Sequence, residues 1–184
     1  MKNPPKALLV LHSMTEQIDW ELDYKSELPR IYNFFLYKIG DREFAQDLTA
    51  TTVERAWKLR SRYKTGIASL STWFFGIARN VLKEHLRKNK MSEQRSEPAF
   101  QSEEMPSSVD VEKSIQQQQE KEHLRKFLLE LPEREQDLIA LKYGAGLTNR
   151  EIAKLTKLSE SNVGSILHRT VRDLRNKLEE DLGR

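Results

Sequence analysis

The stretch TNREIAKLTKLSESNVGSILHRTVRDLRNKL, residues 148–178, predicts two helices joined by a tight turn. Thr148 and Glu151 have the spacing of a capping box, in which each side chain accepts a hydrogen bond from a free backbone N–H at the helix start. The first helix is therefore expected to begin directly after this threonine. Ser159 is a suitable N-cap for the second helix, which leaves only residues 156–158 for the turn. A connection of this length is typical of a helix-turn-helix.

The second helix of this pair is predicted to have one apolar face and one polar face, at about 100° per residue. The apolar positions are Val163, Leu167, Thr170, Val171, Leu174 and Leu178. The opposite positions are Ser161, Ser165, His168, Arg169 and Arg172. A DNA major groove admits a helix that brings short polar side chains and arginines to base edges and phosphates. The alternative is an amphipathic helix with a solvated basic face, but the cap, turn and spacing together favour a DNA reader.

Composition narrows the class of protein. The chain has 184 residues, of which 32% are charged and 38% hydrophobic, so it is a helix-rich domain or two small ones. Cysteine is absent, and the four histidines are far apart in sequence, so we expect neither a disulfide nor a metal or other cofactor. No apolar run is long enough to span a membrane, and we expect a cytoplasmic protein without membrane insertion.

The charges are divided unevenly along the chain. Residues 1–91 carry 16 basic and 10 acidic side chains, residues 92–120 carry 2 and 7, and residues 121–184 carry 13 and 11. Basic blocks are typical of proteins that meet phosphate groups. The acidic segment also contains Pro98, Pro106 and four consecutive glutamines, which predicts a flexible linker. Its charge alone favours a solvated spacer over a segment that contacts a basic partner.

Upstream of this linker the pattern predicts two helices separated by Gly40. The first carries apolar residues at helical spacing from Leu28 onward, and Asp41 is a suitable cap for the second. The second is expected to end with Trp57 and Leu59, and to bury Phe44, Ala45, Leu48, Thr52, Val53 and Ala56. Its outer face would carry Asp47, Glu54, Arg55 and Lys58.

A third helix is predicted in LSTWFFGIARNVLKEHLRKNK, residues 70–90. The buried positions would be Leu70, Phe74, Ile77, Val81 and Leu82. Roughly opposite, Arg79, Lys83, Arg87 and Lys90 would form a basic ridge that can follow a phosphate backbone. Aromatic rings beside a basic groove are what unpaired bases stack upon. Tyr63 and Trp73 are candidates for that role, although both could equally be core residues.

Beyond the linker, helical spacing resumes at Lys121, is interrupted at Pro132 and stops at Gly144 and Gly146. The sequence therefore predicts an all-α protein of two small helical domains joined by a flexible acidic linker. We place the N-terminal domain at residues 1–91, the linker at 92–120 and the helix-turn-helix domain at 121–184.

With these segments located, the chain resembles the extracytoplasmic-function branch of the sigma factors of bacterial RNA polymerase. Three segments between Leu28 and Leu178 carry the resemblance. They are DLTATTVERAW at 47–57, STWFFGIARNVLKEHLRK at 71–88, and the segment from Leu131 to Leu178. The last is shared in part with other helix-turn-helix regulators, so the order and spacing of all three are more specific than any one.

The resemblance implies binding to core RNA polymerase and to promoter DNA. The helix that contains the first segment would dock on the clamp helices of the largest polymerase subunit, through Asp47, Leu48, Thr51, Arg55 and Lys58. The second, together with the loop before it that begins at Arg62, would open and hold the minus-ten element, through Tyr63, Lys64, Trp73, Arg79, Asn80, Lys83, Arg87 and Lys88. The third would contact the polymerase flap and read the minus-thirty-five element, through Thr148, Ser161, Asn162, Ser165, His168, Arg169 and Arg172.

Further expectations follow from the same resemblance. The acidic linker would lie in the RNA path of the polymerase, and an anti-sigma protein is a possible further partner. The chain departs from the family at Ala50, Thr51 and Val53 in the polymerase-binding helix, and at Asn162 and Gly164 in the reader helix. No basic contact can therefore be assigned to position 164, whereas Arg169 matches a common basic position.

The predicted function is that of a sigma factor, which directs initiation and catalyses no reaction itself. One alternative is a conventional helix-turn-helix regulator that binds duplex DNA as a dimer without polymerase. A second alternative is an enzyme, but the sequence offers no paired nucleophile and base, no phosphate loop and no clustered carboxylates at catalytic spacing.

Overall fold

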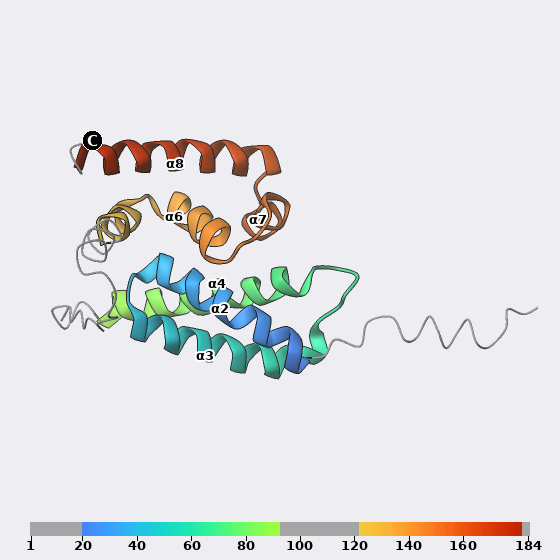
Figure 1. Cartoon of the computed structure of the whole chain (residues 1–184). Coiled ribbons are helices and arrows are strands. Elements are labelled where there is room, and N and C mark those ends of the chain that lie inside the picture. The colour runs from blue at the N-terminus through green and yellow to red at the C-terminus, as the bar shows by residue number, and fades with distance from the viewer. Residues whose placement is uncertain (1–19, 93–121, 182–184) are drawn as a thin grey trace, which may run out of the picture.

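The computed structural model describes residues 20–92 and 122–181, and within these ranges the regular elements are all helical (Figure 1). The predicted linker lies outside the described residues apart from Ser92. The N-terminal unit contains α2 (Trp20–Ile39), α3 (Arg42–Leu59), a 3₁₀ turn η1 (Arg60–Arg62) and α4 (Leu70–Ser92). The C-terminal unit contains a helical segment at 122–130, α6 (Glu133–Ile139), a π-helical turn η2 (Ala140–Gly144), α7 (Asn149–Thr156) and α8 (Glu160–Asp181).

Local signals account for the ends of the N-terminal helices. Gly40 has a φ of +73°, a left-handed conformation that glycine adopts without strain and that ends α2. The Asp41 carboxylate then accepts a hydrogen bond from the backbone N–H of Phe44 at 3.0 Å, which caps α3 as predicted. The α2 helix begins at Trp20, well before Leu28, and continues through Pro29.

The predicted buried face of α3 is confirmed at Ala45, Leu48, Thr52 and Ala56. Phe44 is an error in that prediction, because 46% of it is exposed. Its ring lies 5.5 Å from the His85 ring of α4, so it covers the edge of the α3–α4 contact rather than filling its centre.

Local chemistry also explains the C-terminal unit. Pro132 separates two helices, and the capping box of Thr148 and Glu151 is formed in full at the start of α7. The Ser159 hydroxyl accepts the Asn162 N–H at 3.2 Å, confirming the cap of α8. The wide π turn η2 was not predicted from the sequence; its backbone ring closes between the Ala145 N–H and the Ala140 carbonyl at 2.8 Å.

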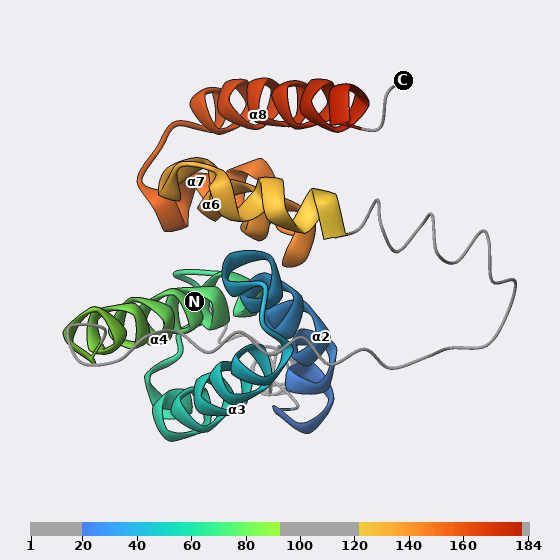
Figure 2. The same cartoon turned by 90° about the vertical axis from the view of Figure 1, so that its left-hand side faces the viewer.

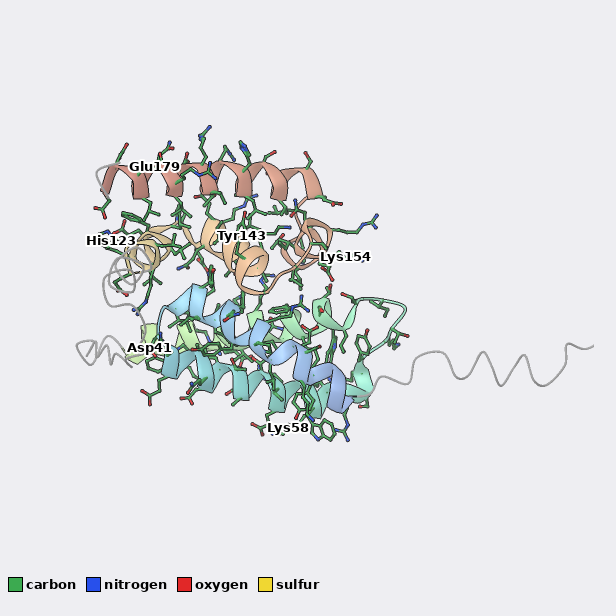
Figure 3. All side chains as sticks on the ribbon, in the orientation of Figure 1. Asp41, Lys58, His123, Tyr143, Lys154 and Glu179 are labelled. Atoms are coloured by element: carbon green, nitrogen blue, oxygen red, sulfur yellow. The ribbon has the colours of Figure 1, made fainter. Side chains whose placement is uncertain are left out.

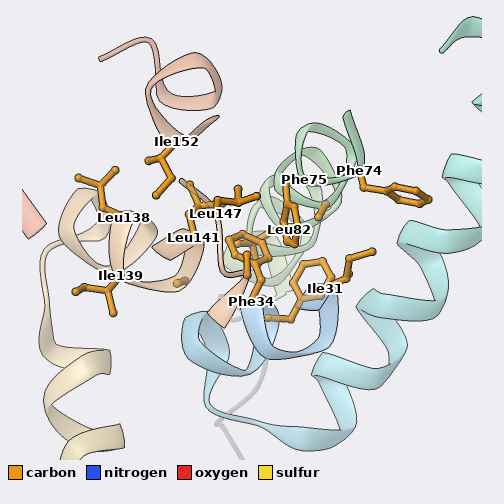
Figure 4. Packing of buried hydrophobic residues seen from close by; sticks show 14 of the residues in the cluster. Ile31, Phe34, Phe74, Phe75, Leu82, Leu138, Ile139, Leu141, Leu147 and Ile152 are labelled. Carbon is orange, nitrogen blue, oxygen red and sulfur yellow. The ribbon is translucent and has the colours of Figure 1, made fainter. Parts of the chain in front are cut away.

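The two units share one hydrophobic core, with α2 packed against η2. Phe34 and Phe75 meet edge to face with centroids 5.8 Å apart, beside Leu141 and Leu147 of the C-terminal unit (Figure 4). Gly144 permits this approach, because a Cβ at that position would lie 3.0 Å from the Asn33 carbonyl oxygen. We call this packing of the two units the closed arrangement.

The α8 helix lies on the side of the molecule remote from α3 (Figures 1 and 2). The N-terminal unit packs against the C-terminal unit through η2, α6 and α7, so it leaves the outer side of α8 uncovered. Across residues 20–92 and 122–181, the helices are too short or too polar to cross a bilayer.

Candidate nucleic-acid interface

The α8 helix presents a continuous polar surface to solvent. Its opposite face is fixed by burial of Val163, Leu167, Thr170 and Leu174, as predicted, and of Ile166, which the prediction missed. With that face held in the core, the exposed side chains are Ser161, Asn162, Ser165, His168, Arg169 and Arg172, together with Thr148 at the start of α7. The structure therefore brings together all the residues predicted to read the minus-thirty-five element. We call this set the reader face.

A groove with a basic rim runs beside the reader face. It is lined by Lys142, Tyr143, Asn149, Gly164, Leu167, His168, Val171, Arg172 and Arg175. Lys142, Tyr143 and Arg175 were not predicted from the sequence as site residues (Tyr143 is seen in Figure 3). Arg175 could have been found, because it follows Arg172 by three residues and so lies one turn further along the same side. Lys142 and Tyr143 come from the π turn, whose placement beside α8 depends on tertiary packing.

The capping box ties the reader to the N-terminal unit. Glu151 accepts hydrogen bonds from the Thr148 N–H at 3.0 Å and from the Ser69 hydroxyl at 3.0 Å. Partial burial acts to raise the pKa of the Glu151 carboxyl, but the hydrogen bonds from Thr148 and Ser69 together outweigh it and leave that pKa below its ordinary value. The carboxylate therefore stays ionised and holds the first turn of α7 in place.

A second candidate surface lies on α4 and the loop before it. Asn80, Lys83, Arg87 and Lys88 are exposed along α4, and Lys64 is exposed in the loop. The rings of Tyr63 and Trp73 lie 5.3 Å apart, and both residues are partly buried. The Tyr63 hydroxyl donates to the Ala68 carbonyl at 2.9 Å, which holds the loop against α4. Each of the two rings therefore has one part packed against the protein and another part exposed to solvent.

Arg79 departs from the predicted exposed ridge. Its Nε and Nη2 donate to the Asp137 carboxylate at 3.2 and 2.8 Å, and its Nη1 donates to the Leu155 carbonyl. The reason is that this side of α4 packs against α7 in the closed arrangement. Only Lys83 and Arg87 of the predicted ridge are seen exposed, because the side chain of Lys90 lies outside the described part.

The predicted polymerase-docking residues of α3 separate into three groups. Asp47, Thr51 and Lys58 are exposed, and Figure 3 shows Lys58 on the side of α3 away from the C-terminal unit. Leu48 is only 6% exposed and belongs to the hydrophobic core. Arg55 forms a two-pronged ion pair with Glu84 of α4, at 2.7 and 2.8 Å. The hydrogen bond to Glu84 raises the pKa of Arg55, and Glu84 correspondingly has a lowered pKa.

Comparisons with known proteins identify two family regions in this chain. Residues 24–91 match the family described as sigma-70 region 2, and residues 121–174 match sigma-70 region 4. Among solved structures, the sigma factor RpoE crystallised in complex with the anti-sigma factor NepR, from Bartonella quintana, has a similar fold. The similarity has a TM-score of 0.65 at 22% sequence identity, covering 90% of this chain and 97% of that one.

Two relatives are similar over most of their length. The ECF RNA polymerase sigma factor RpoE of Cereibacter sphaeroides is 32% identical over 150 residues, which are 78% of each chain. The ECF RNA polymerase sigma factor SigM of Bacillus subtilis is 27% identical over 150 residues, covering 79% of this chain and 86% of that protein. With both sigma-70 regions present in order, the chain belongs to the ECF branch of the sigma-70 family, whose members direct RNA polymerase to initiate transcription at promoters.

Proposed function

We propose that the C-terminal unit reads the minus-thirty-five promoter element through the reader face of α8. The observation that carries this proposal is the exposure of Ser165, His168 and Arg169 on a helix whose other face is fixed in the core. Such a helix can enter a major groove without repacking. Thr148 and the neighbouring N-terminus of α7 would then contact the phosphate backbone.

The N-terminal unit, which we assign to residues 1–91, would open the minus-ten element. Lys83, Arg87 and Lys88 would follow the backbone of the single strand, and Asn80 lies on the same exposed side. An unpaired base would stack at the half-buried rings of Tyr63 and Trp73. Capture of an unstacked base offsets an unpairing cost of a few kcal/mol, so binding alone can drive opening.

Contact with core RNA polymerase would involve the exposed side chains of α3. Asp47, Thr51 and Lys58 are exposed and would contact the clamp helices of the largest polymerase subunit, Lys58 from within an ion pair with Glu54. Arg55 would take part only if it exchanges its partner Glu84. The Bartonella quintana RpoE was crystallised with an anti-sigma factor, and its similarity to this chain supports an anti-sigma protein as a further partner.

A transcription experiment tests this function directly. Purified protein is added to bacterial core polymerase and a library of promoter fragments, with core polymerase alone as the control. Initiation from particular sequences only when the protein is present is the expected result, and the enriched fragments would identify both promoter elements. Tight, sequence-specific retention of duplex DNA by the protein alone, with no effect on core polymerase, would instead support the conventional regulator.

Trp73→Ala should impair promoter opening more than promoter binding. Stacking of one base on an aromatic ring contributes about 1–3 kcal/mol, so we expect open complexes to fall about tenfold. Permanganate reactivity of unpaired thymines measures the opening. A template with a preformed bubble is the control and should restore most of the loss, because it removes the unpairing step. Normal reactivity of the variant on closed duplex would return Trp73 to a purely structural role.

A further inference from the structure

Two cations of the N-terminal unit converge on one carboxylate of the C-terminal unit. Lys38, in the last turn of α2, places its Nζ 3.7 Å from one Asp137 oxygen. Arg79 of α4 places its Nη2 2.8 Å from the other oxygen. The Lys38 side chain is only 4% exposed and the Asp137 side chain 17%. Arg79 is 32% exposed, so the site is a partly buried cluster in which one carboxylate contacts two cations.

Two polar contacts across this boundary repeat that polarity, whereas in another Gln136 of α6 donates from its Nε2 to the Lys38 carbonyl at 3.3 Å. Arg30 donates from its Nε to the Ala145 carbonyl at 2.7 Å, and Arg79 donates to the Leu155 carbonyl. In these contacts the N-terminal unit supplies the cationic donor and the C-terminal unit supplies oxygen. A DNA backbone offers the same chemistry, because each phosphate is an anion with exposed oxygen acceptors. The carboxylate of Asp137 thus occupies a place that a phosphate group can take.

The buried ammonium of Lys38 favours an anionic partner at this place while the two units are packed together. Burial lowers the pKa of the Lys38 ammonium, while the nearby carboxylates of Asp137 and Glu133 act against that shift. A buried ammonium without an anionic partner is strongly unfavourable. Separation of the two units would expose Lys38 and Arg79 to solvent. Arg79 would then join Lys83 and Arg87, one and two turns further along α4, in an uninterrupted cationic strip.

The expected promoter geometry requires such a separation. Elements centred near minus thirty-five and minus ten are roughly 25 base pairs apart, which is about 85 Å of B-form duplex at 3.4 Å per base pair. In the closed arrangement the two units are in direct contact, and Gly144 lies against the backbone of α2. Units packed in this way cannot hold both elements at once.

We propose that Lys38 and Arg79 form a binding site for a DNA backbone phosphate, and that Asp137 occupies this site in the closed arrangement. The C-terminal unit and DNA then compete for the same two cations. This inference rests on the proposed DNA-binding function, and it adds Lys38 to the DNA-binding residues. It also gives Asp137 a role in keeping the free protein closed.

Energy transfer between two dyes can report whether the two units are in contact. The chain contains no cysteine, so cysteines introduced at two chosen positions would be the only ones to carry the dyes. Glu43→Cys on α3 and Asn176→Cys on α8 place dyes at exposed positions of the two units. Single-stranded DNA of mixed sequence is then added to the otherwise unchanged protein. We expect transfer efficiency to fall with the same midpoint as DNA binding measured by fluorescence anisotropy. Binding of DNA with no change in transfer would overturn the proposal.

Asp137→Asn removes the competing anion and should raise affinity for this DNA by about tenfold, since hydrogen bonds to charged groups are among the stronger ones. The matched control is Glu135→Gln, which makes the same charge change on the same helix α6 and should alter affinity less than about twofold. Equal effects of the two variants would mean that only net charge matters. Adding Lys38→Met to Asp137→Asn should reverse part of the gain, and an unchanged affinity would remove Lys38 from the site.

Gly144→Val opens the units without altering any charge, because its side chain would collide with the α2 backbone at Asn33. It should lower energy transfer and raise DNA affinity with Asp137 intact, which tests the competition even if Asp137→Asn folds poorly. Opening without any gain in affinity would overturn the proposal. Transcription with core polymerase is measured in parallel. If the phosphate site is wrong but the proposed function is right, promoter-specific initiation will be normal. If the proposed function itself is wrong, no such initiation will be seen.

Discussion

Phe34→Ala is expected to lower the free energy of unfolding by about 3–5 kcal/mol. The Phe34 ring is fully buried, and its centroid lies 5.3 Å from the Phe35 ring and 5.8 Å from the Phe75 ring. Removing the ring would therefore leave a cavity at the centre of the core that the two units share. The loss would be a large fraction of a typical domain stability of 5–15 kcal/mol. Urea unfolding followed by circular dichroism measures it.

Phe44→Ala is the matched control for this prediction. It removes the same side chain from the same unit, but 46% of Phe44 is exposed and its main aromatic neighbour is the His85 ring. We expect a loss below about 1.5 kcal/mol, because much less apolar surface leaves water at this site. Equal losses for the two variants would contradict the assignment of Phe34 to the centre of the shared core and of Phe44 to its edge.

Features of the fold with local causes could be predicted from the sequence. Helix starts and stops could be predicted because their causes are local: Asp41, Thr148 and Ser159 each cap the helix that follows directly, and Gly40 ends the one before it. The reader face could be predicted because helical periodicity places one side of α8 in the core. Family resemblance then supplied the function that this face serves.

Features that depend on distant parts of the chain could not be predicted in this way. Periodicity placed Phe44 on the buried side of α3, but the width of that side is set by how α4 packs against it. Arg79 lies on a helix side that looks exposed within α4 alone, and only the docked C-terminal unit covers it. The same holds for Asp137. No role for it could be predicted from the sequence, because its partners, Lys38 and Arg79, are 99 and 58 residues away.

The reader face provides the second large effect. Arg169→Ala should reduce initiation from promoters that depend on the minus-thirty-five element by about 10- to 100-fold, because a good arginine contact to a guanine contributes about 1–3 kcal/mol of discrimination. Arg169 is exposed on α8, one turn after Ser165, on the side of the helix that we propose enters the major groove. Run-off transcription with core polymerase gives the rate, and competition between promoter variants identifies the base pair concerned.

Arg134→Ala is a suitable control, since it removes an exposed arginine of the same unit from α6 rather than from the reader face. If the two arginines acted only through general attraction to DNA, both variants would lose initiation to the same extent. The difference from the unchanged protein would then become smaller as salt is added, because phosphate contacts are screened. Loss of a base contact would be confined to Arg169→Ala and would relax the preference at one position of the element. Initiation by Arg169→Ala that equals that of Arg134→Ala, with an unchanged sequence preference, would mean that α8 enters the groove by another side. His168 would then be the next residue to substitute, because it is exposed on α8 and lines the groove together with Lys142 and Arg175.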